Sequence, residues 1–360
     1  MRTIAVSLHP ADDRSASSAR PVWFRSILNW VWTVFGPFLG LALITALFAG
    51  MTRHSGQFLS VDNWRTIAMH TVIVGTTALG MTVIIIAGGI DLSVGSTVAL
   101  VTVSMALFMK KVDPLLPETL RAWHITMPLA ILIGVALGGL CGVVNGALIS
   151  GLRVVPFIIT LGTYQAFRGL ATWLASSTTV YVPASSRPAW FGRIVAIDPE
   201  PRWLLVAPGV WMLIGLSLAL AVTLRYSLLG RYAYAIGSNE STARLCGINV
   251  PVMKIVVYAL GGLAAGLAGV LQFATLGGVG APTTASGLEL RVIAAVVIGG
   301  GSLSGGEGTV LGTLIGCLIM AVLENGCVHA VISNAIQDIV IGAIIIVAVT
   351  LDRLRRGHAS

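Results

Sequence analysis

The sequence predicts an all-α polytopic membrane protein, and two observations carry this prediction. Of the 360 residues, 56% are hydrophobic and only 10% are charged, whereas about 25% are charged in an ordinary soluble domain. Long apolar stretches also recur along the chain, and a helix that crosses a bilayer needs about 20 such residues. These stretches predict about ten spans, near residues 31–51, 66–88, 92–109, 126–150, 156–175, 204–224, 252–276, 288–300, 308–325 and 333–351.

The eighth of these stretches is too short for a full crossing. Between Pro282 and Gly299 only about a dozen residues are apolar, where a full span needs about 20. We therefore interpret residues 288–300 as a half-helix, and we expect broken or half helices at the glycine-rich motifs of the chain.

Basic residues near both chain ends predict the orientation of the protein. Lys and Arg next to membrane spans are retained on the cytoplasmic side. Seven arginines flank the outermost spans, namely Arg2, Arg14, Arg20, Arg25, Arg353, Arg355 and Arg356. Both termini are therefore expected in the cytoplasm. We expect residues 1–28 to be a disordered cytoplasmic tail, residues 29–352 the transmembrane domain and residues 353–360 a second cytoplasmic tail.

The net charge of +8 does not indicate a nucleic-acid partner. The basic residues are scattered over predicted loops and chain ends, whereas a nucleic-acid surface gathers them on one face. Membrane topology explains their distribution better. The expected surroundings are therefore a lipid bilayer, with no nucleic acid.

The chain lacks the motifs of the common nucleotide-dependent and hydrolytic enzymes. A P-loop needs Gly-Lys followed by Ser or Thr to hold phosphates, and none of the three lysines follows a glycine. The patterns H-E-x-x-H, G-x-S-x-G and G-x-G-x-x-G do not occur, and the four cysteines show no C-x-x-C spacing. We therefore expect no enzymatic activity, cofactor or metal in this chain.

Glycines recur every four residues in two of the predicted spans. The two series are Gly134, Gly138, Gly142 and Gly146, and Gly308, Gly312 and Gly316. This spacing places the glycines in a line on one helix face, where a neighbouring helix can approach closely. The series predict tight helix packing and a compact bundle.

An eight-residue pattern, G-G-x-[D/S]-L-S-x-G, occurs twice in the chain. Residues 88–95 read Gly-Gly-Ile-Asp-Leu-Ser-Val-Gly, and residues 299–306 read Gly-Gly-Gly-Ser-Leu-Ser-Gly-Gly. Paired glycines end one helix, and Asp91 or Ser302 can then cap the next by accepting from an amide two or three residues on. Each site is thus a predicted helix break, and the duplication indicates two related halves.

Two interpretations of these breaks stay open. Broken helices are tolerated at membrane depth inside protein or beside a water-filled cavity, where they mark the substrate path of several transporters. The alternative is a short, capped cytoplasmic turn. The candidate residues are Gly88, Gly89, Asp91, Ser93, Gly95, Gly299, Gly300, Ser302, Ser304 and Gly306. Asn145, beside the first glycine series, is expected to make an interhelical hydrogen bond.

The predicted cytoplasmic connection 225–251 contains a short helix of its own. Ser238 or Asn239 can cap its start, with Glu240 favourably placed against the helix dipole. Gly247 supplies a left-handed stop, and Ile248 supplies the accompanying hydrophobic contact. A helix of about two turns is marginal alone in water, so we expect it to dock on a partner.

Four segments identify a family when they are taken in order. They are MTVIIIAGGIDLSVGSTVAL at residues 81–100, PFIITLGTYQAFRGLA at 156–171, GRYAYAIGSNESTARLCGINV at 230–250 and VIGGGSLSGGEGTVLGTLIG at 297–316. These segments resemble the permease subunits of sugar-importing ABC transporters of the ribose, xylose and galactose type. The similarity runs from about residue 60 to residue 351.

The resemblance implies a subunit of a bacterial inner-membrane importer for a monosaccharide. It implies three protein partners: a cytoplasmic ABC ATPase that binds the ATP, a periplasmic sugar-binding protein, and a second permease copy or paralogue that completes a dimer. The short helix would insert into the ATPase. The residues expected to couple the two subunits are Gly237, Asn239, Glu240, Ala243, Arg244, Gly247 and Ile248.

Two other functions are compatible with parts of the sequence. A branched-chain amino acid permease of the same superfamily has comparable glycine-rich breaks, although the wording GGIDLSVGS favours sugars. An autonomous ion-coupled transporter would need ionisable residues arranged within the membrane for an ion relay. The few ionisable residues here lie mostly near span ends, which disfavours that function.

Overall fold

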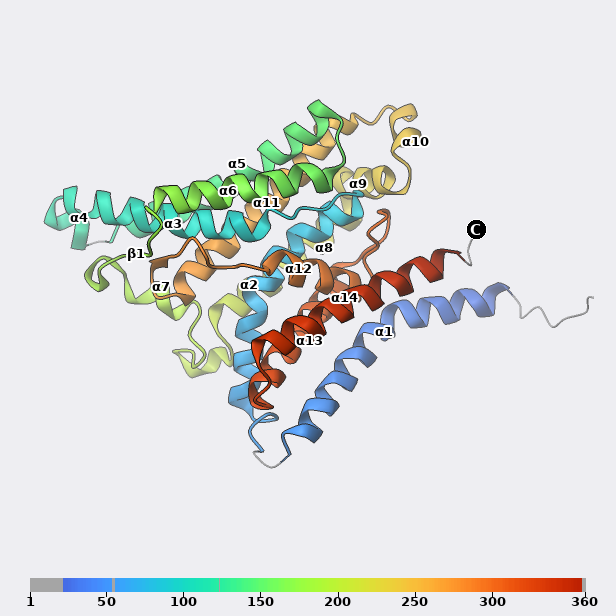
Figure 1. Cartoon of the computed structure of the whole chain (residues 1–360), viewed down its shortest axis with the longest axis horizontal. Coiled ribbons are helices and arrows are strands. Elements are labelled where there is room, and N and C mark those ends of the chain that lie inside the picture. Colours follow the sequence, from blue (N-terminus) through green and yellow to red (C-terminus); the bar gives the residue numbers. More distant parts are fainter. Residues whose placement is uncertain (1–21, 54–55, 123, 358–360) are drawn as a thin grey trace, which may run out of the picture.

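The computed structural model describes residues 22–53, 56–122 and 124–357 (Figure 1). A helix lies over each of the ten predicted spans, which confirms the all-α class. These helices are α1 (Val22–Met51), α2 (Val61–Ile86), α3 (Val94–Val112), α5 (Thr126–Leu152), α6 (Pro156–Leu174), α8 (Pro208–Tyr226), α11 (Val250–Thr275), α12 (Leu288–Ile298), α13 (Val310–His329) and α14 (Asn334–Gly357).

Shorter elements connect these helices. They are η1 (Asp113–Leu115), α4 (Glu118–Ala122), η2 (Ala184–Ser186), α7 (Ala189–Arg193), η3 (Arg202–Leu204), α9 (Leu228–Ser238), α10 (Glu240–Leu245), β1 (Val180–Tyr181) and β2 (Val279–Gly280). The two strands form an antiparallel pair in which Val180 is opposite Gly280. Five helical segments in the described part of the chain are long and apolar enough to cross a membrane: α2, α5, α11, α13 and residues 202–226 around α8.

The first and last helices extend beyond the expected transmembrane domain. Helix α1 begins at Val22, so its first turns lie within the range 1–28 that we expected to be a tail. Residues 1–21 lie outside the described residues. Helix α14 continues to Gly357, and its last turn therefore occupies most of the expected C-terminal tail.

Helix α12 is the half-helix that the sequence predicts. It has 11 residues, which correspond to about 16 Å of helix, roughly half the thickness of the hydrocarbon core. Six consecutive residues of α12, 292–297, are buried hydrophobic side chains. The helix is therefore surrounded by protein over most of its length.

The centre of the bundle is formed by α2 and α11, with α3 and α5 packed on α11. The first predicted glycine series lies at the α5–α11 contact, as expected. A Cβ on Gly138 would overlap the Gly266 backbone of α11, and one on Gly142 would overlap the carbonyl of Tyr258. The bare backbones therefore approach each other directly along this line.

The second glycine series differs in one member from the expectation. A Cβ on Gly312 would overlap the Gly299 carbonyl, and one on Gly316 would overlap the Ala295 carbonyl, so both glycines pack α13 against α12. Gly308, in contrast, precedes α13, which begins at Val310. Its φ is 155°, and it lies in an irregular loop. The break before α13 is longer than the sequence pattern suggested.

We expect Gly142→Ala to destabilise the protein by about 1–3 kcal/mol, as overpacking of a tight contact does. The matched control is Gly151→Ala on the same helix, because no atom lies within 4 Å of a Cβ added there. Thermal unfolding of the purified protein in detergent measures both effects. Equal unfolding temperatures for the two variants would contradict the close α5–α11 contact.

The two ends of the bundle carry different connections (Figure 1). Helix α10, the α9–α10 turn and the C-terminal end of α14 lie toward one end, which we call the α10 end. The α1–α2 loop and the segment around α7 lie toward the other end, which we call the α7 end. There, Arg65 Nε donates to the carbonyl of Leu205 at 2.9 Å, so the loop before α8 is fastened to the start of α2.

Candidate functional site

The first helix break begins where α2 ends. The amide of Gly88 donates to the Ile85 carbonyl and that of Gly89 to the Ile84 carbonyl, both at 2.9 Å. Gly88 has a φ of 78°, the left-handed conformation that this helix stop requires and that glycine adopts without strain. The predicted role of the paired glycines is therefore confirmed at this break.

Asp91 caps the following helix in the way that the sequence predicts. Its Oδ1 accepts from the backbone amide of Ser93 at 2.8 Å and from the Ser93 hydroxyl at 2.7 Å. Helix α3 begins at the next residue, Val94. The Asp91 side chain is only 2% exposed, so this cap lies within the protein.

Asn145 reaches this cap from α5. Its Nδ2 donates to the Ser93 hydroxyl at 2.8 Å and lies 3.3 Å from Asp91 Oδ1. Asn145 has no exposed surface, and its Oδ1 has no hydrogen-bond partner in the described structure. The expected interhelical hydrogen bond is confirmed, and it joins α5 to the first break. Tyr258 of α11 adds a second tie, because its hydroxyl donates to the Ile90 carbonyl at 3.1 Å.

The second break has the same helix stop but a longer connection. Gly300, with a φ of 91°, and Gly301 donate to the carbonyls of Val297 and Val296, at 2.9 and 2.8 Å. The stop glycine is thus the second glycine of the motif here, whereas Gly88 is the first of its motif. The two copies of the pattern are therefore shifted by one residue in structure.

The predicted cap at Ser302 is wrong. Its hydroxyl lies 3.4 Å from the amide of Ser304, but α13 starts only at Val310. Thr309 caps that helix instead, because its Oγ1 accepts from Gly312 at 3.0 Å. The intervening glycines, Gly305 and Gly306, have positive φ angles and fold the chain into a loop, so the helix cannot start where the pattern predicted.

Both breaks meet the connection 225–251 at a cluster of glycines. The amide of Gly306 donates to the carbonyl of Ile86, the last residue of α2, at 2.9 Å. A Cβ on Gly305 would lie 2.8 Å from the Cα of Gly88 and 2.7 Å from the carbonyl oxygen of Gly237. We call Gly88, Gly237, Gly305 and Gly306 the glycine junction.

Gly237 is the most crowded member of the glycine junction. It lies near the C-terminus of α9, and a Cβ on it would overlap the Ile86 carbonyl and lie 2.5 Å from the Gly306 nitrogen. Tyr234, one turn earlier, donates its hydroxyl to the Gly308 carbonyl at 2.8 Å. Burial raises the pKa of Tyr234, which keeps this phenol protonated as the donor. Helix α9, which the sequence did not predict, therefore contacts both breaks.

Helix α10 has the predicted caps. Asn239 accepts from the amide of Thr242 at 2.9 Å. At the other end Gly247, with a φ of 84°, donates to Arg244, and Ile248 donates to Ala243, both at 3.1 Å. These bonds form a complete left-handed helix stop. The short helix is thus defined at both ends by its own sequence.

The charged residues of α10 have different surroundings. Glu240 binds Lys254 of α11 at 2.8 Å and Arg244 at 2.9 Å, so it fastens α10 to α11. Arg244 remains 65% exposed as a side chain. Leu245, which sequence reasoning missed, is 89% exposed and forms an apolar tip on this helix. The signal was present in the sequence, because Leu245 is a large apolar residue in the last turn of a short helix on a polar connection.

The remaining predicted residues lie around the breaks without joining one cluster. Gly95 lies against Glu289 of α12, which the sequence analysis also missed. Gly299 packs on α13, and Ser304 is exposed in the second break. The structure thus joins the first break to Asn145, and it joins both breaks to Gly237 and to each other at the glycine junction.

Comparison with known proteins agrees with this architecture. A model of the family described as "Branched-chain amino acid transport system / permease component" matches residues 63–349. The ribose import permease protein RbsC of Escherichia coli K12 is 36% identical over 322 residues, which cover 88% of this chain and 93% of the relative. No solved structure matches the chain.

Two further relatives import other sugars according to their names. The D-allose transport system permease protein AlsC of Escherichia coli K12 is 35% identical, over 90% of this chain and 92% of its own length. The fructose import permease protein FrcC of Rhizobium meliloti is 32% identical, over 89% and 86%. The resemblance found in the four sequence segments is confirmed, and the chain belongs to the family of sugar ABC importer permeases.

Proposed function

We propose that this chain moves a monosaccharide across the bacterial inner membrane, driven by ATP hydrolysis in a cytoplasmic partner subunit. The observation that carries the proposal is the glycine junction. It places α9 in direct backbone contact with the end of α2 and with the second break. A displacement of the α9–α10 segment would therefore act on both helix breaks at once.

The expected contact with the ATPase is α10. Its caps hold it as a defined helix, and its bond from Glu240 to Lys254 fixes it on α11. The exposed tip offers an apolar side chain, Leu245, beside the cationic Arg244. This combination suits insertion into a cleft on a protein partner, where a leucine loses contact with water.

The other proposed partners follow from the arrangement of the chain. Helices α5 and α6 expose large apolar side chains such as Leu132, Leu140 and Phe157, which suit lipid or a second permease copy. Helix α10 and the end of α14 lie at the same end of the bundle (Figure 1), which supports cytoplasmic termini. The α7 end would then face the periplasm and receive the sugar-binding protein.

The proposed function is tested by uptake into vesicles that contain the chain, its ATPase and its sugar-binding protein. We expect uptake of one of the labelled sugars ribose, allose or fructose, and only when ATP is supplied on the ATPase side. The description of the matching family names branched-chain amino acids, so labelled leucine is the necessary comparison. ATP-dependent uptake of leucine without any sugar uptake would contradict the proposal.

We expect Leu245→Asp to weaken binding of the ATPase subunit about tenfold or more, because it puts a charge where the proposed complex would bury an apolar side chain. Leu115→Asp is the matched control, since Leu115 is 81% exposed and lies in η1, far along the chain from α10. Co-purification of the ATPase and its affinity measured by titration give the readout. Equal binding by the two variants would contradict the assignment of α10 as the contact.

A further inference from the structure

A polar cavity of about 850 Å³ lies at the α7 end of the bundle. It is formed by the start of α2, the end of α13, the start of α14 and the α1–α2 loop. All its lining residues except Ile197 and Val328 are polar. None of them belongs to the helix breaks or to the coupling segment, so this cavity is separate from the site described above.

The cavity lies at the ends of the membrane-spanning helices. Its lining runs along α2 from Asp62 to His70, about 12 Å of helix, and of these residues only Thr66 and His70 fall within the predicted span 66–88. Glu324 of α13 and Gln337 of α14 lie on the facing walls. Polar and ionisable groups on membrane helices turn toward protein or water because lipid cannot solvate them. The polar side chains of this lining therefore face an open cavity between the helix ends.

One side of the cavity is held by a network of hydrogen bonds. Asn63 donates to the Phe58 carbonyl at 2.7 Å and to Asn325 Oδ1 at 2.9 Å, and its own Oδ1 lies 2.9 Å from His329 Nε2. These bonds fix the wall between α2 and α13. Within the described residues, no hydrogen bond or ion pair involves the side chains of His70, Asn334 and Gln337, so these groups can bind a ligand.

The charge of the lining selects among ligands. It includes the carboxylates of Asp62 and Glu324 but no lysine or arginine. Each carboxylate is paired with an arginine, Asp62 with Arg65 and Glu324 with Arg291, so the lining has little net charge and favours a neutral ligand over an anion such as a lipid headgroup or a phosphate. Side-chain amides, carboxylates and imidazoles offer donors and acceptors together, as the hydroxyls of a neutral sugar require. The volume lies within the range of about 300–1,000 Å³ that small-molecule sites have.

The cavity is also linked to the second helix break. Glu324 in its wall forms an ion pair with Arg291 of α12 at 3.1 Å. Helix α12 ends at Ile298, and the second break begins at Gly299. A ligand that binds Glu324 would compete for a group that holds α12 in place, and it would thereby act on the break.

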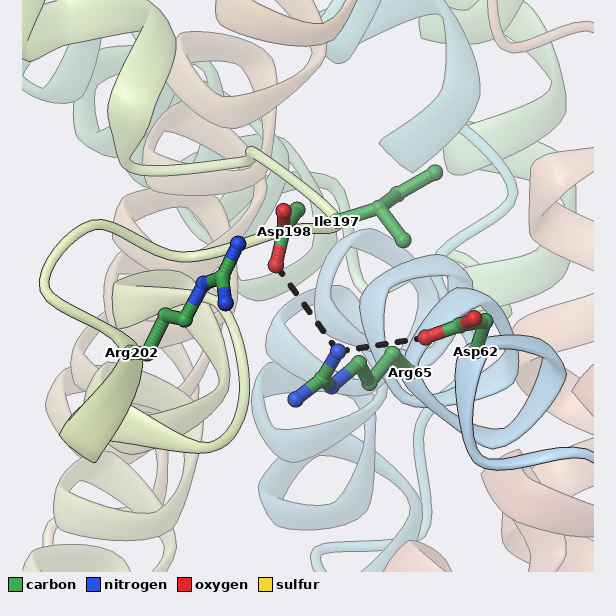
Figure 2. Close-up of a pocket in the computed structure, with 5 residues that line it drawn as sticks. All are labelled: Asp62, Arg65, Ile197, Asp198 and Arg202. Carbon is green, nitrogen blue, oxygen red and sulfur yellow. Dashed lines mark hydrogen bonds and ion pairs between the residues drawn. The ribbon is translucent and has the colours of Figure 1, made fainter.

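A smaller cavity of about 440 Å³ adjoins the first and shares Asp62 and Ile197 with it. Figure 2 shows Arg65 between two carboxylates in this region. Its Nη1 lies 3.1 Å from Asp62 and 3.7 Å from Asp198, so it joins α2 to the loop that precedes α8. Arg65 thus lines the smaller cavity and holds Asp62, which both cavities share.

We infer that the polar cavity is an entry subsite for a neutral monosaccharide, which His70, Glu324, Asn334 and Gln337 bind through the sugar hydroxyls. This inference rests on the proposed function, because it takes the α7 end as the periplasmic side. It adds to that function a place where the sugar binds before it reaches the helix breaks.

The test uses vesicles that contain the chain with its ATPase and sugar-binding protein. Gln337→Ala removes hydroxyl partners, and Asn334→Trp fills the cavity from an exposed position. We expect each to lower sugar uptake about tenfold or more, while the sugar-loaded binding protein still stimulates ATP hydrolysis. Gln165→Ala, an exposed glutamine on α6, is the control and should transport at the normal rate. Thermal unfolding identifies any variant whose loss comes from misfolding.

The outcomes separate the subsite from the proposed function. Normal uptake by both variants, while the unchanged protein transports sugar, overturns the subsite and leaves the proposed function standing. If the variants lose both sugar uptake and the stimulation of ATP hydrolysis, this surface docks the binding protein, and the subsite is also overturned. So does uptake by the unchanged protein that requires anionic lipid and is abolished in vesicles of neutral lipid. Absence of any sugar uptake by the unchanged protein contradicts the proposed function itself.

Discussion

Gly237→Ala is expected to lower sugar uptake about tenfold or more, because overpacking of a tight contact costs about 1–3 kcal/mol and each 1.4 kcal/mol is tenfold. The added methyl group would overlap the Ile86 carbonyl and press on the Gly306 nitrogen. Neither neighbour can move independently, since the two are joined by a 2.9 Å hydrogen bond. The substitution therefore forces α9 away from both helix breaks.

The measurement compares uptake and ATP hydrolysis in the same vesicles. If the glycine junction transmits movement, the variant still binds its ATPase through α10, and ATP hydrolysis continues while uptake falls. Gly215→Ala is the matched control, because this helical glycine of α8 has no atom within 4 Å of an added Cβ. Normal uptake by Gly237→Ala would show that the contact between α9 and the breaks is not needed for transport.

The glycine junction is confined to backbone atoms, and this has a consequence for coupling. A contact between two flexible side chains can absorb a displacement of an ångström by changing rotamers. The contacts at Gly237 and Gly305 involve backbone atoms alone and leave no side chain to do so. Movement of α9 must therefore displace the end of α2 or the second break, or separate them.

Local features of the structure could be predicted from the sequence. The two caps of α10 depend on residues within nine positions of one another, and the left-handed conformation of Gly247 follows from glycine alone. The same holds for Gly88 and for the bond from Asp91 to Ser93. The glycine spacing predicted a close helix contact along α5, but it did not indicate that α11 is the partner helix.

Contacts between distant segments were not predictable from one sequence. Gly237 lies about 150 residues from Ile86 in the chain, and no local pattern indicates that they touch. Ser302 shows how a pattern can mislead, because residues 303–309 separate it from α13, whereas only residues 92–93 separate Asp91 from α3. Glu240 was expected to contact the partner, but Lys254 of α11 already binds it. The polar cavity was missed because its walls come from α2 and from the consecutive helices α13 and α14, which lie far from α2 in sequence.

Asp91→Asn is expected to lower uptake about tenfold and to destabilise the protein by about 1–3 kcal/mol, the cost of leaving a buried polar group unpaired. The new amide can still accept from the Ser93 amide through its Oδ1, so the helix cap persists. Its NH2 group, however, would face the Nδ2 of Asn145, which now donates toward Asp91 at 3.3 and 3.4 Å. Two donors would then oppose each other at a buried site.

The exchange of both residues tests this explanation directly. In the double variant Asp91→Asn with Asn145→Asp, the amide at position 91 faces a carboxylate at position 145, and the Ser93 hydroxyl can donate to that carboxylate. Uptake and unfolding temperature should recover a large part of the loss. Asp338→Asn, at an exposed position of α14, should change neither. If the double variant is as impaired as the sum of its single changes, the tie from α5 to the first break is not what transport requires.

If the double variant recovers, the buried pair acts as one unit that holds the start of α3 against α5 while the glycine junction holds the end of α2 against α9. The first break is then fixed on both sides, and it can open only when one of these two contacts yields.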